Sequence, residues 1–560
     1  MIATRIRSGG EILAAALRKH GVDLIFGVPG ESYLAALDGF YRERDALRFI
    51  ACRHEGAAAH MAEAYGKLTG RPGICTVTRG PGATHASIGV HTAMQDSTPM
   101  ILFVGQVARE MRGREAWQEI DVRATFSTLA KWAEQIDDAR RIPEIVSRAF
   151  YTATSGRPGP VVLALPEDML TDEVDVEDAE PFKVVQPSAS AEQIGDVCVM
   201  LARADRPLVL VGGSGWDTRA CADLQRFAEM HSLPVVTTFR RQDLFDNRHR
   251  LYAGHAGLGM DAALAQRIRD ADLLLAIGPR LGETSTNGYR LLAIPRPEQR
   301  LIHVHPSANE LGRVYAADLP INAGTASFVR ALAALPPPEF PVWKRWAACA
   351  HQEYLQRFRG AASARALDLT AVMHHLSEQL PKNAILTNGA GNYAIWLHRY
   401  YQYAPYRTQL APNSGAMGYG LPAAIAAKLV HPERTVVNVA GDGCFLMTGQ
   451  ELATAVRYDL PVIVLVVNNA SYGSIRAHQE MQYPERVIGT DLTNPDFVAF
   501  ARSFGAYAER VEKTEQFAAA FERARNAGRP AVLELITDPD VLTPERDVET
   551  VRRHAAERRH

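Results

Sequence analysis

Residues 435–469 read TVVNVAGDGCFLMTGQELATAVRYDLPVIVLVVNN, and their pattern predicts the fold of the region around them. An apolar run ends at Gly441-Asp442-Gly443, a helical segment follows, and a second apolar run ends at Asn468-Asn469. Short apolar runs on either side of a helix are typical of buried parallel strands. Because the carboxyl ends of neighbouring parallel strands face one crevice, Asp442 and Asn469 can meet there.

This pairing indicates a site for a hard cation that is bound to phosphate. Mg²⁺ prefers oxygen ligands and often bridges a protein carboxylate and phosphate groups. Gly441 and Gly443 would let the backbone approach the phosphates, and the start of the next helix offers free N–H groups. The alternative is a tight turn and an Asn cap that bind nothing.

The same alternation of apolar runs and helices occurs in two further blocks. An acidic segment, residues 172–190, and a proline-rich segment, residues 333–343, separate the blocks. We therefore predict an α/β protein of three doubly wound parallel-sheet domains, with limits 1–175, 190–335 and 365–545. The first and third blocks are similar in size and style, which allows two related domains around a middle one.

Composition excludes several other classes of protein. The formal net charge of −2 provides no basic field for nucleic acid, so we expect no such partner. Six scattered cysteines form no CxxC pair, which fits a cytoplasmic protein without disulfides. No apolar run reaches transmembrane length, and the N-terminus predicts an amphipathic helix, so no membrane partner is expected. The Arg- and His-rich tail, residues 546–560, is expected to be solvated or frayed.

The GDG…NN pattern resembles the thiamine-diphosphate signature of the pyruvate decarboxylase and acetolactate synthase superfamily. The resemblance implies that the carboxylate of Asp442, the side chain of Asn469 and the backbone carbonyl of Ser471 bind Mg²⁺. It also implies cofactor contacts from Gly441, Gly443, Tyr472 and Gly473. By the same resemblance the first domain binds the pyrimidine, the middle one is Rossmann-like, and the third binds the diphosphate.

Glu55 lies in FIACRHEGAAAHMAEAYGKLTGRPG, residues 49–73, where it follows a strand and opens an Ala-rich helix. A lone Glu there is usually an acid favoured by the helix dipole. Together with a GPGAT turn expected at 80–84, however, the segment resembles the pyrimidine-binding domain of the superfamily. The matching Glu exchanges a proton with N1′ of the aminopyrimidine, which a Gln could not do. Pro29 and Gly30 are implied as further cofactor contacts.

Met417 lies in SGAMGYGLPAAIAAKL, residues 414–429. It matches the bulky apolar residue that separates the two rings of the cofactor in this superfamily. A Met between small residues is otherwise core filler. The position of Met417 relative to the other two motifs favours the role of the residue that separates the two rings.

Three stretches of the sequence resemble the acetolactate synthase branch of the superfamily. They are residues 80–107, REAWQE at 114–119, and residues 449–469. In REAWQE, Gln118 matches a Gln expected to donate a hydrogen bond to the reacting carbonyl; the alternative is a surface-loop Gln. Trp117-Gln118 replaces the two adjacent His of simple decarboxylases, and Ile475 stands near their Glu. Without those proton donors, we expect a carboligase that decarboxylates pyruvate or a similar 2-oxoacid and adds the product to a second carbonyl. A decarboxylase, acyloin lyase or C–C hydrolase is the alternative.

Two residues depart from the synthase pattern. Glu31, in GVPGESY, stands where synthases have a small residue, and His85 replaces an Asn common after GPGAT. Both are candidate catalytic residues that would change the acceptor pocket. Glu31 could instead be a helix-start acid.

The middle block has glycine loops at 212–216 and 278–291 and the segment HVHPSANELGR at 303–313. In synthases this domain binds FAD. Here His305 and Pro306 stand where an acidic residue would hold a ribose, so FAD, an ADP group and an empty site all remain open. The resemblance also implies a homodimer or homotetramer with active sites between subunits.

Overall fold

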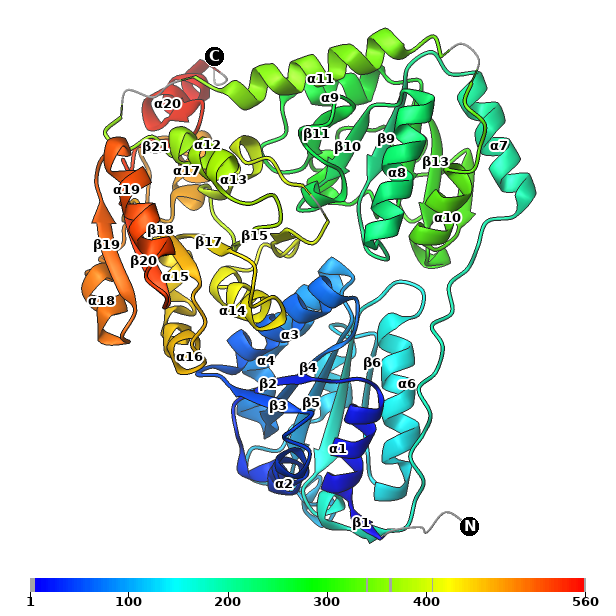
Figure 1. The fold of residues 1–560 in the computed structure, drawn as a ribbon, viewed down its shortest axis with the longest axis vertical. Coiled ribbons are helices and arrows are strands. Elements are labelled where there is room, and N and C mark those ends of the chain that lie inside the picture. Colours follow the sequence, from blue (N-terminus) through cyan, green and yellow to red (C-terminus); the bar gives the residue numbers. More distant parts are fainter. Residues whose placement is uncertain (1–5, 339–340, 362–364, 405, 558–560) are drawn as a thin grey trace. The chain divides into compact units, whose positions relative to one another are not determined.

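The computed structural model describes residues 6–338, 341–361, 365–404 and 406–557. Three six-stranded parallel sheets dominate the described chain (Figure 1). The chain divides into two compact units. The first comprises the chain up to Val185 together with Pro412–Pro432 and Thr448–Tyr458, and the second comprises the remainder.

The first unit contains the first sheet, with helices on both of its faces. One face packs through Ile74, Ile101 and Leu163 against α1 (Gly9–Lys19) and α6 (Ile142–Thr154). Alternate strand residues point to the opposite face, where α3 (Glu55–Thr69) and α4 (Arg79–Asp96) contact the sheet. The strands in spatial order are β3 (Arg48–Ala51), β2 (Leu24–Gly27), β4 (Gly73–Thr78), β5 (Met100–Gln106), β7 (Pro160–Pro166) and β6 (Trp132–Gln135).

Two later helices complete the first unit. α14 (Gly420–Val430) packs along α3, as Figure 1 also shows, and α16 (Leu452–Arg457) contacts α14. Both helices come from the third block of the sequence. The first unit is therefore discontinuous in the chain.

The second unit contains the middle sheet. Helices α7 (Ala191–Ala202), α8 (Thr218–His231) and α10 (Thr325–Leu332) cover one face. The other face packs against α9 (Ala262–Asp270) and α11 (Lys344–Arg359). Its strands are β11 (Tyr252–Ala256), β10 (Val235–Thr238), β9 (Pro207–Val211), β12 (Leu273–Ile277), β13 (Arg300–His305) and β14 (Leu319–Asn322).

The third sheet also belongs to the second unit. Its strands in spatial order are β16 (Gln409–Leu410), β15 (Ile385–Asn388), β17 (Val436–Gly441), β18 (Ile463–Asn468), β20 (Ala531–Ile536) and β19 (Tyr507–Val511). Its helices are α12 (Leu369–Gln379), α13 (Ala394–Tyr400), α15 (Asp442–Leu446), α17 (Gly473–Gln482), α18 (Phe497–Ser503) and α19 (Thr514–Arg525).

Strand order relates the first sheet to the third. With strands numbered by chain order within each sheet, both run 2-1-3-4-6-5, whereas the middle sheet runs 3-2-1-4-5-6. The predicted fold class, three doubly wound parallel sheets, is confirmed, and so is the likeness of the outer two. Each predicted domain range encloses one sheet; the limits 1–175, 190–335 and 365–545 stay predictions.

Two local expectations are wrong. GPGAT at 80–84 is not a separate turn but lies within the first turns of α4, which begins at Arg79. Pro81 is tolerated there because the first N–H groups of a helix have no intrahelical partner. The tail is not simply solvated: α20 (Val548–Glu557) buries Val548 and Val551 against Leu542 and Ala477.

None of the helices in the described part of the chain combines the length and the apolar character needed to cross a bilayer.

Candidate active site

Glu55 is the first residue of α3, at the carboxyl end of the edge strand β3. Its side chain is 15 % exposed, and Oε2 lies 2.9 Å from Nδ1 of His85, on α4. Among the described residues, none hydrogen-bonds to Oε1 of Glu55. One carboxylate oxygen is therefore fixed, and the other is available to a ligand.

A second imidazole supports this contact. The ring of His54 stacks on that of His85, with centroids 4.6 Å apart. Nδ1 of His54 accepts a hydrogen bond of 3.0 Å from the Gly56 N–H, so this nitrogen carries no proton. Burial, helped by the neighbouring His85, lowers the pKa of His54, which keeps its ring neutral. The ligand atoms of His54, Glu55 and His85 lie within 4.8 Å of one another, but imidazole nitrogens suit transition metals and not Mg²⁺.

The backbone leading into Glu55 is held by Glu451, a fully buried residue that sequence reasoning missed. Its Oε1 accepts hydrogen bonds of 3.0 Å from the N–H groups of both Arg53 and His54. Its Oε2 lies 2.5 Å from the Thr454 hydroxyl. Burial raises the pKa of the Glu451 carboxyl. The residue stands within a stretch that supported the branch assignment, but nothing in its spacing indicated a contact with residues 53 and 54.

Arg79 is a second missed residue, and it brings two predicted ones close together. Its buried guanidinium donates to Glu167 at 2.7 Å and to the Trp117 carbonyl at 3.4 Å, and lies 3.8 Å from the Glu31 carboxylate. Glu31 is 59 % exposed. Gln118 is half-buried and has a φ of +64°, and its carbonyl accepts from the Gly80 N–H at 2.9 Å. The backbone of the turn at 117–118 is thus fixed to the start of α4.

Pro29 and Gly30 follow β2, at the same edge of the first sheet. Pro29 is exposed, and a Cβ on Gly30 would lie 2.5 Å from Cβ of Thr78. Met417, also in the first unit, is half-buried and lies between two glycines with positive φ, Gly415 and Gly418. These residues belong to the unit that contains Glu55.

In the second unit, Asp442 is the first residue of α15 and is only 2 % exposed. The amide Nδ2 of Asn494 lies 2.8 Å from Oδ2 of Asp442 and 3.0 Å from Oδ1 of Asn468. The Asn494 amide thus lies within hydrogen-bond distance of residues at the ends of both β17 and β18. These two strand ends converge, as the sequence predicted. Burial raises the pKa of Asp442.

Asn469 and Ser471 lie in the turn after β18. Oδ1 of Asn469 accepts from the Ser471 N–H at 3.2 Å, and the buried Oγ of Ser471 has no hydrogen-bond partner among the residues that the structure describes. A carboxylate, amide oxygens and a backbone carbonyl are the donor set that Mg²⁺ prefers. The residues present therefore fit this ion.

The predicted glycines have a packing role here. A Cβ on Gly441 would lie 2.9 Å from the Tyr393 ring, and one on Gly443 would lie 2.6 Å from the Tyr472 ring. A Cβ on Gly473 would lie 2.8 Å from the Asn392 amide. These positions need glycine because side chains of the protein press against them.

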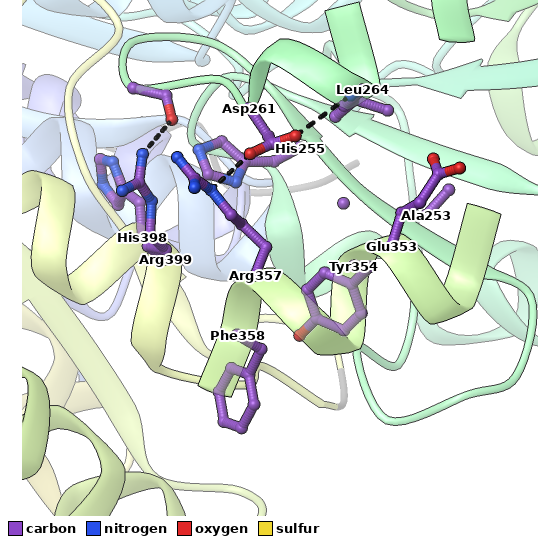
Figure 2. A pocket seen from close by; sticks show the side chains of 12 residues that line it. Ala253, His255, Asp261, Leu264, Glu353, Tyr354, Arg357, Phe358, His398 and Arg399 are labelled. Atoms are coloured by element: carbon purple, nitrogen blue, oxygen red, sulfur yellow. Dashed lines mark hydrogen bonds and ion pairs between the residues drawn. The ribbon is translucent and has the colours of Figure 1, made fainter. Parts of the chain in front are cut away.

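A small cavity of about 40 Å³ lies beside β11, lined by residues of the middle domain and by His398 and Arg399 of α13 (Figure 2). Arg357 forms an ion pair with Asp261 in it, and Arg399 donates to the Gly259 carbonyl at 3.1 Å. None of the predicted stretches 212–216, 278–291 and 303–313 contributes to its described lining.

Those stretches instead pack tightly. A Cβ on Gly213 would lie 2.0 Å from the Gly278 carbonyl oxygen. Nδ1 of His305 accepts from the Ser307 N–H at 3.1 Å, and residues 305–309 contain no carboxylate. The first carboxylate after β13 is that of the buried Glu310.

Comparison with known proteins identifies the family of the chain. Three models of thiamine pyrophosphate (thiamine diphosphate) enzymes match the chain: the N-terminal TPP binding domain at 7–125, the central domain at 194–332 and the C-terminal TPP binding domain at 389–535.

Curated relatives match over almost the whole chain. A probable acetolactate synthase large subunit from Methanocaldococcus jannaschii is 33 % identical, covering 96 % of this chain and 93 % of the relative. The acetolactate synthase large subunit of Corynebacterium glutamicum is 31 % identical, covering 95 % and 87 %. The large subunit of acetolactate synthase isozyme 2 from Escherichia coli is 30 % identical, covering 95 % and 96 %. The chain therefore belongs to the thiamine-diphosphate-dependent enzymes, in the branch of the acetolactate synthase large subunits.

Proposed function

We propose that this enzyme is a Mg²⁺-dependent carboligase. It decarboxylates pyruvate or a similar 2-oxoacid and adds the remaining acyl unit to a second carbonyl compound, as the names of its relatives suggest. The observation that supports this most directly is the Glu55 carboxylate, with one oxygen fixed by His85 and the other available. Thiamine diphosphate, when bound, would supply a carbon nucleophile and an electron sink for the electron pair that departing CO₂ leaves behind.

In this proposal Glu55 exchanges a proton with the aminopyrimidine. The exchange needs an acid with one free oxygen in a fixed position, which the contacts with His85 and Glu451 favour. Met417 would keep the pyrimidine and thiazolium rings apart by its bulk. Pro29 and Gly30 would contact the same cofactor, and Gly441, Gly443, Tyr472 and Gly473 would contact its diphosphate side.

Asp442, Asn469 and the carbonyl of Ser471 would hold Mg²⁺. Their oxygens suit this ion, and the convergence of β17 and β18 supports one shared site. The ion would neutralise the diphosphate and hold it in place.

Gln118 would donate a hydrogen bond to the substrate carbonyl oxygen. Its fixed turn supports this role. Neither Trp117 nor the half-exposed Ile475 can donate a proton to the reacting carbon. Release of a simple aldehyde is therefore disfavoured relative to attack on a second carbonyl.

Product analysis tests the proposal. The purified enzyme, given thiamine diphosphate, Mg²⁺ and pyruvate, should form acetolactate, or acetoin after loss of CO₂. Acetaldehyde as the sole product, with no carboligation on adding other 2-oxoacids, would contradict it.

The second candidate is a decarboxylase, acyloin lyase or C–C hydrolase. It is favoured by two solvent-accessible groups able to transfer protons, Glu31 at 59 % and His85 at 53 % exposure. Release of aldehyde from an acyloin, or cleavage of a diketone, would support it.

The middle domain leaves FAD and an ADP group as candidate ligands. The packed glycines, and His305 as the last residue of β13, do not favour a flavin ribose contact at this strand end. The visible absorption spectrum of the purified protein, and nucleotide analysis after heat release, distinguish FAD, ADP and an empty site.

We further propose a homodimer or homotetramer. The relatives are named as large subunits, which also allows a second kind of subunit. Light scattering of the purified chain, alone and with cofactor, measures its assembly state.

A further inference from the structure

His85 departs from the sequence pattern of the synthases, in which an Asn is common at this position. In this structure its Nδ1 lies 2.9 Å from Oε2 of Glu55, and both residues belong to the first unit. An assembly with active sites between subunits therefore leaves this pair within one chain. The contact between an imidazole and the acid expected to exchange protons with the cofactor suggests a second step in the path of that proton.

The contact requires a proton between the two groups. A carboxylate oxygen and an unprotonated imidazole nitrogen are both hydrogen-bond acceptors, so one of them must carry the hydrogen. The proton lies either on Nδ1 of His85 or on Oε2 of Glu55, and a shift along the 2.9 Å contact moves it from one to the other. The pair is therefore able to transfer a proton. An Asn amide at position 85 could donate a hydrogen bond to Oε2 but could not transfer its hydrogen.

The ring of His85 is supported on one side and open on another. The His54 ring stacks on it with centroids 4.6 Å apart, and the hydrogen bond from the Gly56 N–H to Nδ1 of His54 holds that second ring in place. Nε2 of His85 has no hydrogen-bond partner among the described residues, and the side chain is 53 % exposed. An active site that takes up a 2-oxoacid and releases CO₂ also admits water, so we expect water to reach this nitrogen in the assembled enzyme.

We propose that His85 passes to and from water the proton that Glu55 exchanges with the aminopyrimidine. In one direction a solvent proton moves to Nε2 of His85, the Nδ1 proton moves to Oε2 of Glu55, and the Oε1 proton moves to the ring nitrogen. The reverse direction returns each proton to its origin.

This sequence of transfers balances at each residue. His85 and Glu55 each gain one proton as they lose another, so both stay neutral, and no unpaired charge forms at the Glu55 carboxyl, which is only 15 % exposed. The inference rests on the role proposed for Glu55.

Two variants separate proton transfer from simple positioning of Glu55. His85→Asn introduces the residue common in synthases, whose amide can still donate to Oε2 but cannot pass a proton on. His85→Ala removes the ring and leaves space that free imidazole, added to the buffer, can occupy. His91→Asn is the matched control, because His91 is also an exposed histidine of α4 and has no hydrogen bond or ion pair with Glu55 in the described structure.

The readouts are thermal stability of the cofactor-free protein, affinity for thiamine diphosphate with Mg²⁺, and hydrogen–deuterium exchange at C2 of the bound cofactor. His85→Asn should keep the first two and slow C2 exchange about 10-fold or more. This loss is smaller than the full effect of a general acid because water can partly replace the ring. In His85→Ala, C2 exchange should rise in proportion to the added imidazole, which should accelerate neither the parent nor His91→Asn.

C2 exchange in His85→Asn at the parent rate would overturn the inference, because His85 would then only position Glu55. Slow exchange in His85→Ala that imidazole does not raise would overturn it as well, and this arm decides the matter if His85→Asn does not fold. Failure of the parent protein itself to bind thiamine diphosphate or to exchange C2 would instead contradict the proposed function.

Discussion

The two carboxylate oxygens of Glu55 have different surroundings. Oε2 lies within hydrogen-bond distance of His85, whereas Oε1 makes no hydrogen bond with any described residue. Glu55→Gln keeps a hydrogen-bonding group of the same size but removes the exchangeable proton. We expect it to retain binding of thiamine diphosphate with Mg²⁺, and to lose C2 exchange and turnover by about 10²- to 10⁴-fold. Isothermal titration and quenched-flow exchange measure the two quantities separately.

Glu192→Gln is the control for that variant. Glu192 is also an acid in the first turn of a helix, α7, but it is exposed and outside both candidate sites. Glu192→Gln should match the parent protein in cofactor binding, C2 exchange and turnover. Normal turnover in Glu55→Gln would refute the role given to Glu55.

Asp442 tests the metal site in the same way. Asp442→Ala removes the one carboxylate of the proposed ligand set, so thiamine diphosphate and Mg²⁺ should no longer raise the thermal midpoint. In the parent protein, ligand at 100 times its Kd should stabilise by about 2.7 kcal/mol, and EDTA should abolish the gain. Asp196→Ala, at an exposed position in α7, should behave like the parent. An undiminished midpoint shift in Asp442→Ala would place the ion elsewhere.

Some functional residues can be predicted from the sequence and others cannot. Glu55 and Asp442 lie at strand ends within recognisable sequence motifs, and ligands bind at the strand ends of parallel sheets. Arg79 and Glu451 were missed because their partners are far away in the chain. Arg79 contacts residue 167, and Glu451 contacts residue 53. No local pattern encodes such pairs.

At the scale of elements, the apolar runs of the sequence leave out five strands of the three six-stranded sheets, and each of the five lies at a sheet edge. They are β6, β11, β14, β16 and β19. An edge strand is flanked on one side only, so its residues need not be continuously apolar. β14 and β19, for example, alternate irregularly between buried and exposed positions. The central strands were found because burial on both faces gives them unbroken apolar runs.

The junction between β3 and α3 depends on Glu451, which permits a conservative test. Its two oxygens have different partners, two N–H groups at Oε1 and a hydroxyl at Oε2, an arrangement that a Gln amide can reproduce. Glu451→Gln should keep most activity. Glu451→Ala removes the acceptor of the Arg53 and His54 N–H groups and should lower the free energy of unfolding by about 1–3 kcal/mol. Calorimetry and steady-state kinetics of both variants check this, and equal damage in both would contradict it.

The same residue predicts a pH effect. Burial raises the pKa of the Glu451 carboxyl in the folded state above its unfolded value. Its contribution to stability is therefore complete below the ordinary pKa of about 4.3 and is lost as the pH rises through the raised value. The difference in thermal midpoint between parent and Glu451→Gln should decline over that range. A constant difference from about pH 4 to pH 8 would show that the group does not titrate there.

At the scale of the whole molecule, buried neutral histidines predict weakness in acid. Burial lowers the pKa of His60 to about 4 and that of His398 well below 6.5. Unfolded histidines bind protons near pH 6.5, so stability is present above that pH and is lost as the pH falls towards about 4. For His60 the loss amounts to about 3 kcal/mol.

Thermal midpoints measured from about pH 7 down to about pH 4 should fall steeply in the parent protein. His60→Leu removes one titrating group, so its thermal midpoint should fall less steeply over the same pH range. Parallel curves for the two proteins would exclude His60 as a source of acid sensitivity.

Because the first unit is discontinuous in the chain, it cannot fold completely until its last segment has been synthesised. Its last segment ends at Tyr458, roughly 270 residues after Val185. At about 5–20 residues per second, a ribosome needs roughly 15–55 s to deliver that segment. During this interval the nascent N-terminal region has neither α14 to cover α3 nor Tyr419 and Asn413 to pair with Glu63 and Asp96. We therefore expect a fragment that stops at Val185 to engage chaperones and aggregate, whereas a chain extended through Tyr458 can close this unit.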